Sequence, residues 1–129
     1  MAKGFKCGSG KDFPMELLWE NARPTSSFSE QTISIDFSKF TDVAVDFAIT
    51  TEYKNYSRVF AKVGDNGFFV GIRPYTSTYA QFCVRIFTYP ATGIKFNAAY
   101  KTIGTQAGRT EDNTFCIPVR IYGIKGVTT

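Results

Sequence analysis

The sequence predicts an all-β protein, folded as a two-sheet antiparallel β-sandwich of jelly-roll type with about eight strands. Three observations predict it. Apolar and polar residues alternate with a period of two along most of the chain, and no window shows a sustained helical period. Turn-forming residues recur about every ten residues, a spacing typical of sandwiches and barrels. The chain also contains 13 Phe and 7 Tyr residues, which favour pleated, half-buried surfaces.

The length and composition indicate one globular domain. A chain of 129 residues is long enough to bury a core without stabilising cross-links. Its apolar fraction of 43% is that of a globular protein, which excludes a disordered chain. No apolar run reaches the roughly 18 residues that a membrane helix needs. A net charge of +4 is mild and favours an anionic partner without identifying one.

Residues 1–12 are predicted to form a flexible, basic, Gly-rich arm in front of a sandwich domain at 13–129. Lys3, Lys6 and Lys11 precede the first acidic residue, and glycines lie between them. The arm is either a solvated tail or a docking arm that binds a neighbouring subunit. It has no continuous apolar segment of the secretory kind, so synthesis in a cytoplasm is expected.

The first three strands are expected at residues 15–20, 31–37 and 42–50. The first, MELLWE, holds Trp19, which either anchors one end of the sandwich or is an ordinary core residue. The segment NARPTSSFSEQ that follows is predicted to be a surface crossover whose Ser and Thr side chains cap turns. The next two strands alternate, and their inward faces are expected to hold Ile33, Ile35, Phe37, Val43, Val45, Phe47 and Ile49.

The segments SRVFAKV and GFFVGIRPY are predicted to form a hairpin, because Asn66-Gly67 is the strongest short signal for a two-residue turn. The core face of the hairpin is then expected to hold the pairs Val63–Val70 and Ala61–Ile72. The opposite face alternates cations and rings, namely Arg58, Phe60, Lys62, Phe69, Arg73 and Tyr75. This candidate face has three interpretations: ordinary cross-strand packing, a subunit interface, or a platform for a ligand such as a sugar or an anion.

The last three strands are expected at residues 80–89, 93–103 and 114–124. Alternation places Phe82, Val84 and Ile86 on one face of the first of these, and Ile117, Val119 and Ile121 on one face of the last. Pro118 cannot donate a ladder hydrogen bond, so it belongs on an edge strand or at a bulge.

The residue inventory gives little support to catalysis. The absence of His excludes Ser-His and Cys-His dyads. Cys7, Cys83 and Cys116 lack the spacing of a zinc site and are expected to be free thiols, the last two buried. Asp36, Asp42, Asp46 and Glu52 could supply the paired carboxylates of a glycosidase, but Asp36 and Asp46 fall on polar strand faces and are interpreted as solvated charges. We therefore predict no enzyme activity, no metal and no cofactor.

Two stretches resemble a small β-rich domain of phage and prophage tail proteins, which are virion structural proteins. They are MELLWENARPTSSFSEQTISIDFSKFTDVAVDF near the start and NTFCIPVRIYGIKG at the end, and they bracket nearly all of the chain. The resemblance implies a virion component, such as a tail fibre tip, a baseplate accessory or a head decoration. It carries no catalytic or binding residue over to this sequence.

The partners that this resemblance implies are copies of the same chain, with a trimer favoured, and other virion proteins. A host cell-surface glycan is a further candidate partner. Nucleic acid is not favoured, because the charge is mild and evenly spread, and no membrane partner is expected. Two alternatives from other classes stay open: a free carbohydrate-binding, lectin-like module and a small hydrolase that uses carboxylates.

Overall fold

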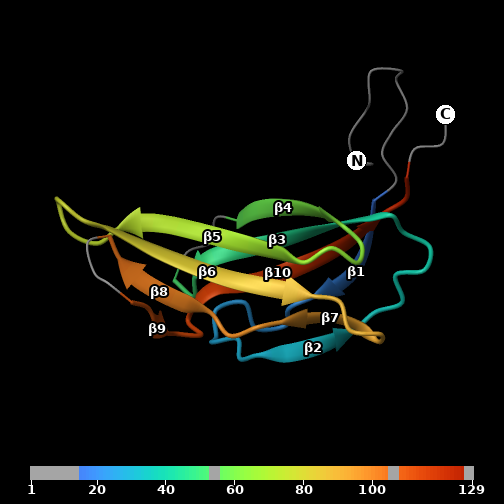
Figure 1. Ribbon diagram of the computed structural model, residues 1–129, viewed down its shortest axis with the longest axis horizontal. Helices are drawn as coiled ribbons and strands as arrows, with labels where there is room; N and C mark the ends of the chain where they lie inside the picture. The colour runs from blue at the N-terminus through green and yellow to red at the C-terminus, as the bar shows by residue number, and fades with distance from the viewer. Residues whose placement is uncertain (1–14, 53–55, 105–107, 127–129) are drawn as a thin grey trace, which may run out of the picture.

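The computed structural model describes residues 15–52, 56–104 and 108–126. Within these ranges the protein is all-β, with two antiparallel sheets and ten strands (Figure 1). The strands are β1 (Met15–Glu20), β2 (Gln31–Ser34), β3 (Asp42–Thr50), β4 (Tyr56–Lys62), β5 (Gly67–Pro74), β6 (Ala80–Thr88), β7 (Gly93–Phe96), β8 (Tyr100–Ile103), β9 (Thr110–Glu111) and β10 (Phe115–Ile124).

The two sheets lie face to face, as Figure 1 shows for β5 and β6 in front of β3 and β10. The sheet called here the β10 sheet has the order β1-β10-β3-β4. The other, called the β6 sheet, has the order β2-β7-β6-β8-β9, and β5 also pairs with β6. Since β7 and β8 pair with successive parts of β6, they share one of its edges and β5 occupies the other.

The predicted fold class, an antiparallel β-sandwich, is confirmed. The pairings of β1 with β10 and of β2 with β7 are nested in the sequence, as in a jelly roll. The chain forms more strands than expected because the run 93–103 divides into β7 and β8, and because the two-residue β9 adds to the sheet edge. Between β7 and β8, Asn97 N–H donates to Ile86 O and Ala99 N–H to the side chain of Asn113.

The core lies between the sheets and is built from aromatic rings. Phe47 of β3 is at its centre and is fully buried. It stacks on Phe69 at a centroid distance of 4.9 Å and lies 6.0 Å from Phe96 and 6.3 Å from Phe87. The inward faces predicted for β3 and β10 are confirmed, because Val43, Val45, Phe47, Ile117, Val119 and Ile121 are all buried.

The segment between β1 and β2 crosses from the β10 sheet to the β6 sheet, as predicted. Its entry is held by Asn21, whose main-chain N–H donates to Val119 O at 2.8 Å and whose Nδ2 donates to Pro118 O at 2.9 Å. Phe28 in this segment is buried and meets Trp19 edge to face at 6.0 Å. Trp19 therefore packs against the core, whereas Leu17 is half exposed.

The predicted hairpin between the fourth and fifth strands is wrong. β4 pairs with β3 along its whole length, and β5 pairs with β6, so the Asn66-Gly67 turn carries the chain from one sheet to the other. The expected core face of β5 is also wrong, because Val70 and Ile72 are exposed at 47% and 56%. A register counted across the turn does not apply to strands that belong to different sheets.

Pro118 lies in a central strand, so the edge-strand alternative is wrong. β10 is placed between β1 and β3, and its register with β3 shifts between Pro118 and Arg120. The extra residue at this β-bulge interrupts the ladder beside the proline, which has no N–H to contribute. The bulge alternative is confirmed.

Candidate functional site

The six residues predicted to form one face of cations and rings lie on two sheets. Arg58, Phe60 and Lys62 alternate along β4 and so share the outer face of the β10 sheet, opposite β3 instead of β5. Phe60 is 55% exposed there. The candidate docking arm with Lys3, Lys6 and Lys11 lies outside the described residues.

The other three candidates belong to the β5 region and do not join the β4 face. Phe69 is buried in the core, which corrects its predicted place on the outer face. Arg73 is half-buried, and its Nε donates to Gln81 Oε1 at 3.0 Å. Tyr75 follows β5 directly and is 54% exposed. The sequence therefore placed Arg58, Phe60 and Lys62 on one face correctly, but it paired their strand with β5 instead of β3.

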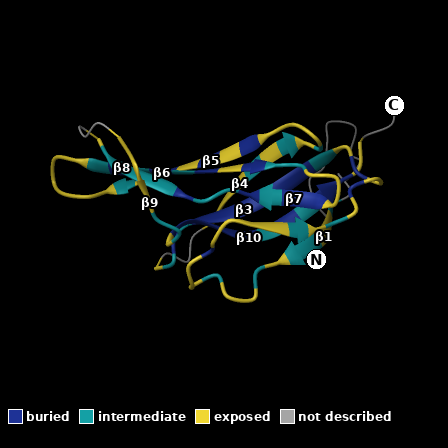
Figure 2. Ribbon diagram, turned by 60° about the horizontal axis from the view of Figure 1, so that its bottom comes forward, coloured by how far each residue is buried: buried dark blue, intermediate teal, exposed yellow. Residues whose placement is uncertain are grey.

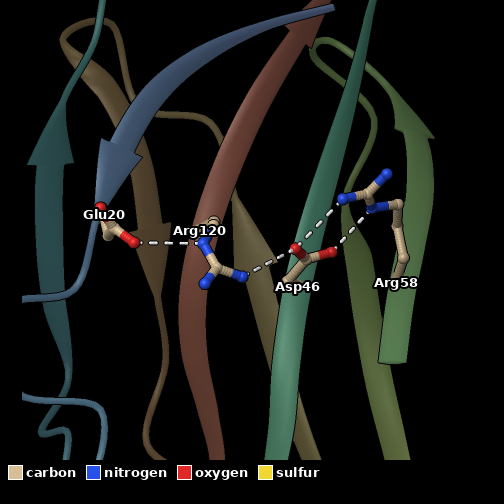
Figure 3. Close-up of polar contacts among 4 residues, drawn as sticks. All are labelled: Glu20, Asp46, Arg58 and Arg120. Carbon is tan, nitrogen blue, oxygen red and sulfur yellow. Dashed lines mark hydrogen bonds and ion pairs between the residues drawn. The ribbon is translucent and has the colours of Figure 1, made fainter. Parts of the chain in front are cut away.

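A chain of ion pairs crosses the outer face of the β10 sheet (Figure 3). Arg58 of β4 binds Asp46 of β3 with two hydrogen bonds, Nε to Oδ1 at 2.7 Å and Nη2 to Oδ2 at 3.2 Å. On the other side of Asp46, Arg120 Nη1 lies 3.6 Å from Oδ2. Arg120 Nε in turn donates to Glu20 Oε2 of β1 at 3.1 Å. The network connects all four strands of the sheet.

Asp46 is buried at 5% exposure, which corrects its interpretation as a solvated charge. Two arginines neutralise the carboxylate, and the hydrogen bond from Arg58 to Asp46 raises the pKa of Arg58. Asp36 lies elsewhere, on the exposed connection from β2 to β3, where its Oδ1 accepts from Ser38 N–H at 2.9 Å. Asp36 and Asp46, which were considered as members of a carboxylate pair, therefore have separate partners and surroundings.

Replacing the buried Asp46 by asparagine is expected to lower the free energy of unfolding by about 1–3 kcal/mol, because Arg58 and Arg120 lose their shared counter-charge. Urea unfolding of the variant measures the loss. The matched control is Glu20→Gln, which removes only the exposed end of the same network and is expected to cost about 0–1 kcal/mol. Equal losses in the two variants would contradict the central role of Asp46.

The outer face of the β6 sheet carries an apolar ladder. Three cross-strand pairs of β5 and β6 face the same way: Phe68–Ile86, Val70–Val84 and Ile72–Phe82. We call these six residues the β5–β6 stripe. Phe68 is 60% exposed and Ile86 is 40% exposed, and Figure 2 shows the alternation of buried and exposed residues along β5. No member of the stripe is charged.

The outer face of β6 is apolar, while two polar residues lie on its inner face. Gln81 and Arg85 point inward and are buried, while Phe82, Val84 and Ile86 point outward. In a one-sided antiparallel sheet the reverse arrangement is the rule, with apolar residues on the core and polar ones in water. A strand that has apolar side chains on its outer face is typical of a sheet covered on both sides.

Arg85 is held inside the sandwich by main-chain acceptors. Its guanidinium donates to Cys116 O at 2.7 Å, Asn97 O at 2.7 Å and Phe115 O at 3.1 Å. The side chain is fully buried, and its Cζ lies 5.2 Å from the centre of the Phe28 ring. Burial lowers the pKa of Arg85 to about 10, so the group is a cation at neutral pH. These contacts connect β6 with β10 and make Arg85 a structural residue.

A cleft opens at one end of the sandwich, where the β2–β3, β4–β5 and β6–β7 connections meet. Its volume is about 810 Å³, and its lining includes Asp36, Phe37, Val63, Tyr89 and Thr92. The Tyr89 hydroxyl is buried and has no hydrogen-bond partner among the described residues. Burial raises the pKa of Tyr89. A cleft of this size falls in the range of small-ligand sites, about 300–1,000 Å³.

The sequence reasoning missed the β5–β6 stripe, although the signal was present. Residues 67–72, GFFVGI, are apolar at every position, so both faces of the strand are apolar. Such a continuous run indicates a strand covered on both sides. In the described part of the chain, no helix is long and apolar enough to cross a membrane. Comparison with known proteins gave no match to any protein-family model, curated protein or solved structure.

Proposed function

We propose that this protein is a non-enzymatic virion structural subunit that assembles with copies of itself through the β5–β6 stripe. The observation that carries the proposal is the uncharged ladder of six apolar residues, of which Phe68, Val70, Ile72 and Ile86 are exposed, Phe68 at 60% and Ile72 at 56%. Contiguous apolar patches of this kind mark interaction sites on soluble proteins.

A second copy of the chain is the partner that fits the stripe best. An apolar surface without charges can pack against its own copies, and a patch at the symmetry axis of a closed oligomer meets the same patch of the other subunits. The edge of β5 also favours this partner. Among the described strands only β6 pairs with β5, so the outer edge of β5 offers main-chain hydrogen-bonding groups to a second chain. By contrast, the edge strand β4 carries Arg58 and Lys62, charges that oppose edge-to-edge pairing.

The resemblance of the first and last strands to the phage and prophage tail domain supports the virion setting. A tail fibre tip, a baseplate accessory or a head decoration would each place a small β-sandwich in contact with identical neighbours and with other virion proteins. In this setting the chain is made in the bacterial cytoplasm and works as part of the virion. A trimer is the favoured assembly, with the stripes of the subunits packed around the symmetry axis.

The test is the solution molar mass of the full chain by light scattering over a concentration series. The wild-type chain is expected to form a closed oligomer, with the trimer favoured. Val70→Lys places a charge in the centre of the stripe and is expected to raise the dissociation constant at least about a hundredfold. Since Val70 is already 47% exposed in the single chain, the thermal midpoint of the variant is expected to stay close to that of a wild-type monomer.

The matched control is Phe60→Lys, which makes a similar change at an exposed ring on the other sheet. It is expected to leave the assembly intact. If Phe60→Lys disrupts assembly and Val70→Lys does not, the β4 face is the interface and the assignment to the stripe is wrong. A wild-type chain that stays monomeric at high concentration overturns self-assembly altogether.

A lectin-like module is the second candidate function, and the cleft lined by Asp36 and Tyr89 is the observation that favours it. Hydroxyl and carboxylate groups beside aromatic rings are typical of sugar-binding sites. The same light-scattering experiment separates the two functions when it is followed by titration with bacterial surface glycans. A monomer that binds a glycan favours the lectin-like module, and an oligomer without glycan affinity favours the assembly subunit.

A further inference from the structure

Cys83 and Cys116 face each other across the interior of the sandwich. Cys83 lies on β6 and Cys116 on β10, so the two thiols come from different sheets. Their Sγ atoms are 2.7 Å apart, and the residues are 3% and 0% exposed. A disulfide bond is about 2.05 Å long, so only a small approach separates this contact from a covalent link.

The surrounding structure holds the two sulfur atoms in place. A Cβ atom added at Gly71 of β5 would lie 2.8 Å from Cys83 Sγ, so the glycine leaves room for the sulfur beside the main chain. Cys116 has a φ of 51°, an unusual conformation for a residue other than glycine. Its carbonyl accepts the 2.7 Å hydrogen bond from Arg85 Nε, which fixes this part of β10 against β6.

We propose that Cys83 and Cys116 are an oxidation site that closes a disulfide between the two sheets when the protein meets a hydroperoxide. The Cys83 thiolate attacks the peroxide, the O–O bond breaks, and a sulfenic acid and hydroxide form. The Cys116 thiol then attacks the sulfenic sulfur, the S–S bond forms, and water leaves with the remaining proton. Two thiols lose two protons and two electrons, and one hydrogen peroxide becomes two waters.

In this scheme Cys83 attacks first, because Cys116 Sγ donates the hydrogen bond to Cys83 Sγ and so supports a thiolate there. The hydrogen bond from Cys116 lowers the pKa of Cys83, because it stabilises the Cys83 thiolate. The same contact, together with burial, raises the pKa of Cys116, which therefore keeps its proton until the second step.

The experiment treats the reduced full chain with stoichiometric hydrogen peroxide, unfolds it and alkylates the remaining thiols. The expected product contains one alkylated cysteine, Cys7, and a peptide carrying Cys83 linked to a peptide carrying Cys116. A reductant should separate the linked peptides. The cross-linked protein is expected to unfold about 5–15 °C higher than the reduced protein.

Cys7→Ser is the matched control, because it keeps the pair and should give the same cross-link with no alkylated thiol. Cys116→Ser should give none. A second sample of the wild-type chain is refolded from the reduced, unfolded state in a glutathione redox buffer, so that access to the buried thiols does not decide the result. Three alkylated cysteines in both samples, or a cross-link that uses Cys7, would overturn the proposal.

Discussion

Replacing Arg85 by leucine is expected to lower the free energy of unfolding by about 3–5 kcal/mol. The substitution removes a fully buried guanidinium and leaves three main-chain carbonyls, those of Asn97, Phe115 and Cys116, without their donor. A leucine side chain buries little more apolar surface than the methylene groups of Arg85 already bury, so it does not offset the lost hydrogen bonds. The two sheets would lose a polar connection in the middle of the core, where water cannot replace it.

Urea unfolding followed by Trp19 fluorescence measures this loss, since the single Trp of the chain contacts the core rings Phe28 and Phe96. Arg85→Lys retains the charge but not the fork of donors, so an intermediate loss is expected. The matched control is Arg109→Leu, because Arg109 is an exposed arginine whose Cζ lies over the Tyr100 ring at 4.1 Å. A loss of less than about 1 kcal/mol in Arg85→Leu would show that the carbonyls find other partners.

Phe47→Ala is the second large effect, expected to cost about 3–5 kcal/mol of stability. Phe47 is fully buried, and its ring is nearly parallel to that of Phe69, with an interplanar angle of 3°. The same ring contacts Phe87 and Phe96 of the opposite sheet, so its removal leaves a cavity against three other rings. Rigid strands on both sides prevent the core from collapsing into that space.

Chemical unfolding of Phe47→Ala is compared with Phe60→Ala, a substitution on the neighbouring strand that removes a ring 55% exposed to solvent. The exposed site is expected to cost about 1 kcal/mol or less. If the two variants lost the same stability, the ring cluster around Phe47 would not be the centre of the core. If the chain assembles through the β5–β6 stripe, the Phe60→Ala variant should still form the oligomer, because Phe60 lies on the other sheet.

Local alternation was enough to predict most strands of the fold, but it could not predict which strands pair with each other. In β3 the large apolar residues alternate onto one face, so Val43, Val45 and Phe47 were correctly assigned to the core. In β5 both faces are apolar, and alternation cannot distinguish Phe69, which is buried, from Val70, which is exposed. The Asn66-Gly67 signal was read as a hairpin because turn chemistry does not say whether a chain reverses within one sheet or passes to the other.

The sequence predicted only those features of the candidate site that lie within a single strand. Arg58 and Phe60 share a face because they alternate along β4, which is a local property. Their ionic neighbour Asp46 lies on β3, the strand that precedes β4, whereas their aromatic neighbour Tyr122 lies on β10, which no nearby turn brings to β4. Arg85 was unpredictable for another reason: a charged residue in an alternating run indicates the solvent face, and here main-chain oxygens in the core satisfy it.

The use of main-chain oxygens by Arg85 has a consequence for how this fold can diverge. A salt bridge requires two particular side chains, so a substitution at one position must be matched by a substitution at the other. Arg85 places no such demand on positions 97, 115 and 116, because the oxygens it binds belong to every amino acid. Substitutions at those positions can therefore keep these hydrogen bonds, while one inward-facing arginine preserves the junction of the two sheets.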